Sequence, residues 1–262
     1  MTPQPYAPQP YIAQRYQSGH GRARAVVALL IVGAVISLLT IPSHILDMYV
    51  SPLREDQELA DNPMALVALL LTAVLGLATV AVYIATVIMF LMWLYRASNN
   101  IAAFGEPREY SAGWAVGSFF VPFANLAIPY RAVKEIWKKS DPSAEDSFLY
   151  TPSPPGYFPA WWGFWIAMNV ANNIYFRMTL ADAPADATAI VGIASEVLTI
   201  AAAWFAILVV RDIDRRQTER SQTRPHYAGP MPPAPPVFSA QQTASDVHSQ
   251  PAPAHGTATG DA

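Results

Sequence analysis

Apolar residues gather in five blocks along the chain, separated by polar, charged or proline-rich segments. The blocks are 25–46, 65–94, 113–129, 158–176 and 187–210. An α-helix rises 1.5 Å per residue, so about 20 apolar residues cross the ~30 Å hydrocarbon core of a bilayer. Four of the five blocks are long enough. The pattern therefore predicts an all-α fold, a polytopic membrane helix bundle with four full spans.

The block 113–129 is shorter and irregular. Pro122 and Pro129 interrupt it, and Asn125 lies inside it. Proline removes a backbone donor and clashes with the preceding helical turn. Irregular backbone is tolerated at membrane depth where protein buries it. We therefore predict a short, Pro-broken segment that re-enters the membrane or lies at its interface.

Residues 129–140 predict a short amphipathic helix. Its apolar side chains are Val133, Ile136 and Trp137, and its basic ones are Lys134, Lys138 and Lys139. Helices of this kind lie in the membrane interface, where they meet anionic lipid headgroups. The alternative is a juxtamembrane anchor that only sets orientation, and positive-inside placement already explains its lysines. We favour the anchor.

Two features lie at the ends of spans. Trp161, Trp162 and Trp165 crowd the start of block 158–176, as expected of an aromatic belt at the membrane interface. The last block is expected to continue as a solvated helical end over residues 210–216, with Asp212 paired to an arginine one turn later.

Both ends of the chain differ in composition from the membrane domain, which we place at 22–217. Residues 1–21 are rich in Pro, Tyr and Gln, and residues 218–262 in Pro and Ala. Such segments bury too little apolar surface to offset their ordering entropy, so both are predicted to be disordered tails. Pro-rich tails can bind protein partners, although a plain flexible tail is their commoner meaning.

The positions of the basic residues decide the predicted topology. If all five blocks span, the 16 Lys and Arg residues divide poorly between the two sides. If block 113–129 enters and leaves on one side, 14 share a face and only Arg54 and Arg177 lie opposite. Because cytoplasmic loops carry the excess of Lys and Arg, this arrangement predicts that both termini are cytoplasmic.

Composition excludes several classes of function. Hydrophobic residues make up 53% of the chain, charged residues 13%, and the net charge is -3, so the chain is no basic nucleic-acid binder. Cysteine is absent, which removes thiolate nucleophiles, disulfides and cysteine metal sites. Phosphate-loop, HExxH and GxSxG motifs are also missing, and four of the five histidines lie in the tails. We predict no catalytic residue, no metal site and no cofactor.

Several strings resemble a known family. They are WLYRASNN at 93–100, GWAVGSFFVPFANL at 113–126, PYR at 129–131 and EIW at 135–137. The chain is similar over about residues 65–217 to an uncharacterised family of bacterial multi-pass membrane proteins, domain of unknown function 4328. The resemblance implies a location in the bacterial plasma (inner) membrane. It brings no established activity, substrate or catalytic residue.

One candidate site lies within the membrane. Glu196 is the one formal acid inside a span, where a charged carboxylate is costly unless it is paired or faces water. Thr199 shares its face, and Asn169, Asn172 and Asn173 form a polar stripe on the preceding span. These five residues could form a proton, cation or small-ligand site. We favour the alternative, interhelical hydrogen bonding that fixes packing.

A second candidate is a cytoplasmic motif surface that would contact lipid or ligand. Its members come from the family-like strings: Arg96, Asn99, Asn100, Asn125, Tyr130, Arg131 and Glu135. Together these features favour a non-enzymatic binding, sensing or assembly role. The alternative is a small-solute or ion transporter that uses the Glu196 cluster and the broken segment. The absence of a convincing inverted repeat weighs against transport.

Overall fold

The computed structural model describes residues 15–55, 63–143 and 152–223, and every regular element in these residues is helical. In chain order the elements are α1 (His20–Glu55), α2 (Pro63–Ala103), α3 (Ala112–Gly117), the 3₁₀ turns η2 (Ser118–Phe120) and η3 (Ala124–Leu126), α4 (Ile128–Lys139), α5 (Tyr157–Leu180) and α6 (Ala185–Thr223). The all-α prediction is confirmed. Of the predicted tails, residues 15–21 and 218–223 are described, and residues 1–14 and 224–262 lie outside the described residues.

Three described helices are long and apolar enough to cross a membrane: α1 over His20–Leu46, α2 over Leu66–Ala103, and α6. Large apolar side chains such as Leu38, Leu70 and Leu77 are exposed along them, which indicates a membrane-embedded protein. Helix α5 has 24 residues but carries Trp and Asn side chains that lower its apolar character. The fourth span therefore remains a prediction.

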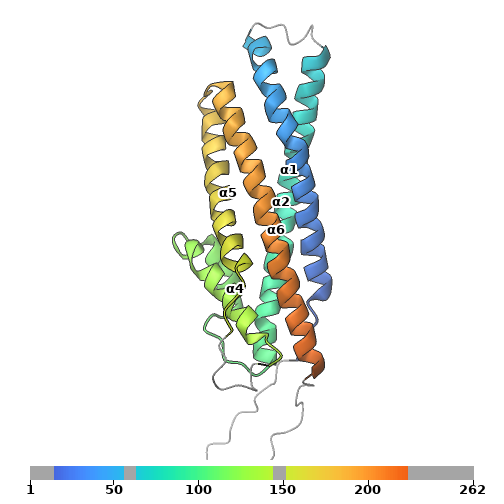
Figure 1. The fold of residues 1–262 in the computed structure, drawn as a ribbon, viewed down its shortest axis with the longest axis vertical. Coiled ribbons are helices and arrows are strands. Elements are labelled where there is room, and N and C mark those ends of the chain that lie inside the picture. The colour runs from blue at the N-terminus through green and yellow to red at the C-terminus, as the bar shows by residue number, and fades with distance from the viewer. Residues whose placement is uncertain (1–14, 56–62, 144–151, 224–262) are drawn as a thin grey trace, which may run out of the picture. The chain divides into compact units, whose positions relative to one another are not determined.

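Helix α1 packs against both α2 and α6, and α5 packs against the other side of α6 (Figure 1). Helices α1 and α6 run antiparallel, because His20 contacts Asp214 while His44 lies near Glu196. We call the end that holds the start of α1 and the ends of α2 and α6 the base. Helix α4 lies there, beside the lower part of α5 (Figure 1).

The block 113–129 is broken, as its prolines predict. Its first helix, α3, has six residues and is capped by the Ser111 hydroxyl, which accepts from the backbone N–H of Trp114 at 3.1 Å. Helix α4 begins only at Ile128, near the end of the block. The chain then turns at Pro122 and Phe123, and Phe123 adopts a φ of 63°, an uncommon value for a residue other than glycine. No helix in this block could cross a membrane.

The apolar face of α4 corrects one expectation. The helix runs Ile128–Lys139, close to the predicted 129–140. However, Val133 is 0% and Trp137 is 1% exposed, because this face packs inward on α2, α6 and the start of α5. The apolar face is thus part of the protein core and does not contact lipid headgroups.

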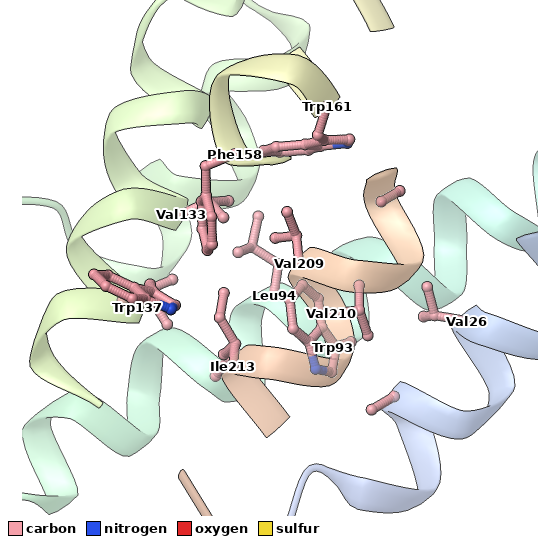
Figure 2. Packing of buried hydrophobic residues seen from close by; sticks show 14 of the residues in the cluster. Val26, Trp93, Leu94, Val133, Trp137, Phe158, Trp161, Val209, Val210 and Ile213 are labelled. Carbon is pink, nitrogen blue, oxygen red and sulfur yellow. The ribbon is translucent and has the colours of Figure 1, made fainter. Parts of the chain in front are cut away.

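The main core lies in the base half of the bundle, and Figure 2 shows its packing from close by. Side chains from five helices converge there: Val26 of α1, Trp93 and Leu94 of α2, Val133 and Trp137 of α4, Phe158 and Trp161 of α5, and Val209, Val210 and Ile213 of α6. Trp161 is 3% and Trp162 is 8% exposed. These two tryptophans therefore belong to the core, and the predicted aromatic belt is wrong for them.

Candidate functional site

A buried amide fastens the segment before α1 to the end of α2. Asn100 is 2% exposed, and its amide donates to the backbone oxygen of Gln17 and to Oε1 of Gln217, each at 3.0 Å. Its side-chain oxygen accepts from the backbone N–H of Gln17 at 3.1 Å. The backbone of Gln17 is thus held in place and α1 begins at His20, so the prediction of a disordered tail over 1–21 is wrong for residues 17–21.

Gln17 and Asn100 form one wall of a pocket of about 610 Å³, which we call the basic pocket. Four segments line it: the approach to α1, the first turn of α1, the end of α2, and α3. Its residues are Arg15, Gln17, Arg22, Leu91, Met92, Tyr95, Arg96, Asn99, Asn100 and Val116. The predicted cytoplasmic motif surface thus contributes Arg96, Asn99 and Asn100.

The basic pocket is electrostatically unbalanced. Three arginines line it and no carboxylate does. Within the described part of the chain, Arg15, Arg22 and Arg96 form no ion pair with Asp or Glu. Arg96 donates instead to the neutral side-chain oxygen of Gln17. An anion in the pocket would offset the mutual repulsion of the three guanidinium groups and accept their hydrogen bonds.

Two buried side chains of α6, Gln217 and Arg220, form further hydrogen bonds at the base. Gln217, 3% exposed, donates to the backbone oxygen of Ala97 at 2.9 Å and to the Ser140 hydroxyl at 3.1 Å. Arg220, 2% exposed, pairs with Glu106 at 2.8 Å and donates to the backbone oxygen of Lys139. These hydrogen bonds stiffen the base, and α6 runs past the predicted domain end at 217.

Asp212 joins three helices, which overturns the expected solvated end at 210–216. Its carboxylate accepts from the indole N–H of Trp137 at 2.6 Å and from the Tyr157 hydroxyl at 2.8 Å. Arg215 also pairs with it at 2.8 Å. Burial and the hydrogen bond to Asp212 raise the pKa of Tyr157 to about 12. This cluster ties α4, α5 and α6 together.

Arg216 completes the junction between α4 and α6. Its guanidinium lies 3.9 Å above the Trp137 ring and pairs with Asp141 at 2.9 Å. Burial acts to raise the pKa of Asp141. Hydrogen bonds from the Ser143 N–H and hydroxyl, together with Arg216, outweigh it and hold that pKa below its usual value.

The other predicted motif residues lie apart from the basic pocket. Glu135 accepts from the backbone N–H groups of Glu109 at 2.6 Å and Tyr110 at 3.3 Å, and pairs with Lys139 at 2.6 Å. Arg131 interacts with the Tyr110 phenol. Tyr130 stacks on Trp162, and Asn125 is half-buried in η3. Glu135 and Arg131 thus link α4 to the segment before α3, and Tyr130 links α4 to α5.

The structure does not bring the predicted intramembrane cluster together. Asn169, Asn172 and Asn173 lie on the exposed side of α5. Asn169 donates to the backbone oxygen of Trp165 within its own helix at 2.7 Å. Asn173 accepts from Arg177 at 2.9 Å, also within α5. The Thr199 hydroxyl donates to the backbone oxygen of Ser195 at 2.8 Å. None of the four forms a hydrogen bond with Glu196 among the described residues.

Glu196 instead lies beside His44 of α1. Its Oε1 is 3.8 Å from Nε2 of His44, a nitrogen that is buried and has no hydrogen-bond partner among the described residues. The imidazole also meets the Tyr175 ring edge-on, with centroids 5.2 Å apart. A half-buried carboxylate thus faces a buried imidazole in the upper part of the bundle.

Sequence reasoning missed this pair because it treated His44 as isolated. A signal was present, since Ser37, Thr40 and His44 recur at helical spacing along one face of α1. Ser37 and His44 are both buried, at 4% and 7% exposure. Among the described residues, no group of three His, Asp or Glu side chains converges as metal ligands would.

The family model described as "Domain of unknown function (DUF4328)" matches residues 56–215. The chain belongs to the DUF4328 family. This confirms the resemblance that the motif strings indicate. The DUF4328 match includes Arg96 and Glu196, whereas Arg22 and His44 precede it, so both sites combine the matched region with α1. No curated protein and no solved structure matches the chain.

Proposed function

We propose that this protein is a multi-pass protein of the bacterial plasma membrane that binds a phosphate-bearing anion at its base, without enzymatic activity. In this proposal α1, α2, α5 and α6 all span, and both termini are cytoplasmic. The charge distribution supports the orientation, because 14 of the 16 Lys and Arg residues fall on one side of these four spans. At 24 residues α5 is about 36 Å long, enough for a span.

The observation that carries the function is the trio of arginines in the basic pocket, none of which pairs with a carboxylate among the described residues. Guanidinium groups present planar arrays of donors that match phosphate oxygens, and arginine is favoured wherever such recognition matters. The buried amide of Asn100 fixes the backbone near Arg15 and thereby shapes the pocket in advance. A pre-formed site loses less entropy when the ligand binds.

The test is a titration of the full-length protein, in an uncharged detergent, with inorganic pyrophosphate. Binding should raise the unfolding temperature, and above the Kd the rise should follow the logarithm of the ligand concentration. Arg22→Gln and Arg96→Gln should each weaken binding about tenfold or more, the usual scale of one charge-assisted hydrogen bond. Arg24→Gln is the matched control, because Arg24 is exposed on the same helix and does not line the pocket. Equal loss in all three variants would point to general charge attraction and refute the site.

A second candidate function is proton-coupled transport, which the His44–Glu196 pair favours. Two titratable groups that face each other inside a bundle can pass a proton, and such groups in spans are functional candidates by default. Glu196→Gln preserves shape and removes the titratable proton. In proteoliposomes with an imposed pH gradient, transport predicts proton flux that this variant abolishes. Equal flux from both proteins would exclude Glu196 as a carrier of protons.

A further inference from the structure

A second cavity, largely apolar, lies within the bundle. Its volume is about 270 Å³, and residues of α1, α2, η2, α5 and α6 line it. It forms because α2 and α5 do not pack closely against each other, although both belong to the same helix bundle. On the α6 side the wall consists of small residues, Ala202, Ala203 and Ala206, which leave the space unfilled.

Five hydroxyl groups line this cavity, and those of the three threonines are satisfied within their own helices. Thr86 donates to the backbone oxygen of Val82 at 2.7 Å, and Thr199 to that of Ser195 at 2.8 Å. Thr79 bonds within α2 in the same way, at 2.9 Å. The cavity therefore offers a ligand apolar surface, with aromatic walls from Phe90 and Trp165. Water finds few hydrogen-bond partners in such a space, whereas a hydrocarbon chain needs none.

The apolar cavity and the basic pocket adjoin along α2. Leu91 lines both of them. Toward the middle of the helix, residues that include Tyr83 line the apolar cavity, and toward the base Arg96 lines the basic pocket. The distance along the helix from Tyr83 to Arg96 is about 20 Å at 1.5 Å per residue. That length exceeds half of the ~30 Å hydrocarbon core.

A ligand that fills both spaces needs an anionic phosphate at one end and an apolar chain at the other. We propose that the two cavities together bind one anionic phospholipid, with its phosphate among Arg15, Arg22 and Arg96 and one acyl chain between α2 and α5. This rests on the proposed function and names its ligand class. A zwitterionic lipid fits less well, because its ammonium group would enter a pocket lined by three cations and no carboxylate.

Three probes separate the headgroup from the chain: phosphatidylglycerol, phosphatidylcholine with the same chains, and soluble glycerol 3-phosphate. Each is titrated into the delipidated full-length protein in uncharged detergent, and the unfolding temperature is recorded. Phosphatidylglycerol should bind at least tenfold more tightly than either of the others. Arg22→Gln and Arg96→Gln should lower the affinity for the two anionic probes, phosphatidylglycerol and glycerol 3-phosphate. Arg24→Gln should leave both affinities unchanged.

The position of the acyl chain is tested by filling the apolar cavity with a larger side chain. Ala203→Leu should weaken phosphatidylglycerol binding about tenfold, the loss expected when two methylene groups leave an apolar site, and should leave glycerol 3-phosphate binding unchanged. Ala203→Val serves if the larger side chain prevents folding. Ala194→Leu is the matched control, because Ala194 is exposed on the same helix and does not line the cavity.

The outcomes separate the two proposals. Suppose that both Ala203 variants bind phosphatidylglycerol as tightly as the unmodified protein does, while the arginine variants bind it more weakly. The acyl chain then lies elsewhere, and the lipid inference fails although anion binding stands. Equal affinity for phosphatidylglycerol and phosphatidylcholine would also overturn the lipid inference. If no arginine variant affects any phosphate ligand, the proposed function itself fails.

Discussion

At the scale of single residues, Gly192 leaves room for the ring of His44. A Cβ atom at position 192 would lie 2.8 Å from Cε1 and from Nδ1 of that imidazole. The ring is buried between α1 and α6 and meets Tyr175 at its edge, so it has little freedom to withdraw. The small residue is therefore what allows the imidazole to lie next to Glu196.

Gly192→Ala should accordingly destabilise the protein by about 1–3 kcal/mol, the usual cost of overpacking a tight interior. Gly76→Ala is the control, because nothing lies within 4 Å of a Cβ atom there and the substitution should stabilise α2 by up to about 1 kcal/mol. Thermal unfolding in detergent measures both. In the double variant with His44→Ala, the cost at position 192 should largely vanish; an unchanged cost would show that the imidazole does not cause it.

Tyr157 gives a prediction that depends on pH. Its pKa is raised to about 12 by burial and by Asp212, so the folded protein holds the phenol proton more tightly than the unfolded chain does. This contribution to stability is complete below pH 10, the ordinary pKa of tyrosine, and is lost as the pH rises from about 10 to about 12.

Tyr157→Phe should cost about 1 kcal/mol at neutral pH, because it removes one hydrogen bond to Asp212. Its stability should fall less than that of the unmodified protein between pH 10 and 12. Unfolding temperatures measured across this range compare the two, with Tyr95→Phe as an exposed control. Parallel curves for the unmodified protein and Tyr157→Phe would refute the assignment.

At the scale of elements, periodicity and hydropathy located the helices well, because each depends on residues close in sequence. Helix α4 matches its predicted range within one residue at each end, and the prolines of block 113–129 do break it. What α4 faces could not be predicted this way. A surface of Val133, Ile136 and Trp137 fits a lipid interface or a protein core equally well, and tertiary contacts decide between them.

The same limit applies to the candidate sites. Spacing placed Asn169, Asn172 and Asn173 on one side of α5 correctly, but it does not fix how that helix is rotated, and the stripe points outward. Likewise, Arg96 and Asn100 stood out as a motif, whereas their contact with Gln17 joins residues far apart in sequence. Such pairings depend on how helices and connecting segments meet, which one sequence does not specify.

The core position of α4 leads to a prediction that distinguishes it from an interfacial helix. Trp137→Ala should destabilise the protein by about 3–5 kcal/mol, because it empties a fully buried site and removes a hydrogen bond to Asp212. Lys138→Ala, on the same helix, should change stability by less than about 0.5 kcal/mol. If α4 served mainly as a lipid anchor, Trp137→Ala would instead leave the unfolding temperature in detergent unchanged.

At the scale of the whole molecule, the arrangement of helices and the distribution of charge support one topology. The start of α1 meets the end of α6, since Nδ1 of His20 lies 2.7 Å from Asp214. The ends of α2 and α6 are joined through Asn100 and Gln217. The basic residues gather mainly on this side of the predicted spans, which the positive-inside rule assigns to the cytoplasm.

Single-cysteine labelling tests this topology directly, because the chain has no cysteine of its own. Ser143 and Thr223 are exposed near the base, and Ala181 is exposed at the turn between α5 and α6. In intact cells, an impermeant thiol reagent should label Ala181→Cys and spare Ser143→Cys and Thr223→Cys, and permeabilised cells should label all three. Labelling of Ser143→Cys in intact cells would place the α4 side outside and reverse the proposed orientation. The basic pocket would then face away from the cytoplasm, and its ligand would have to be an anion of the outer side.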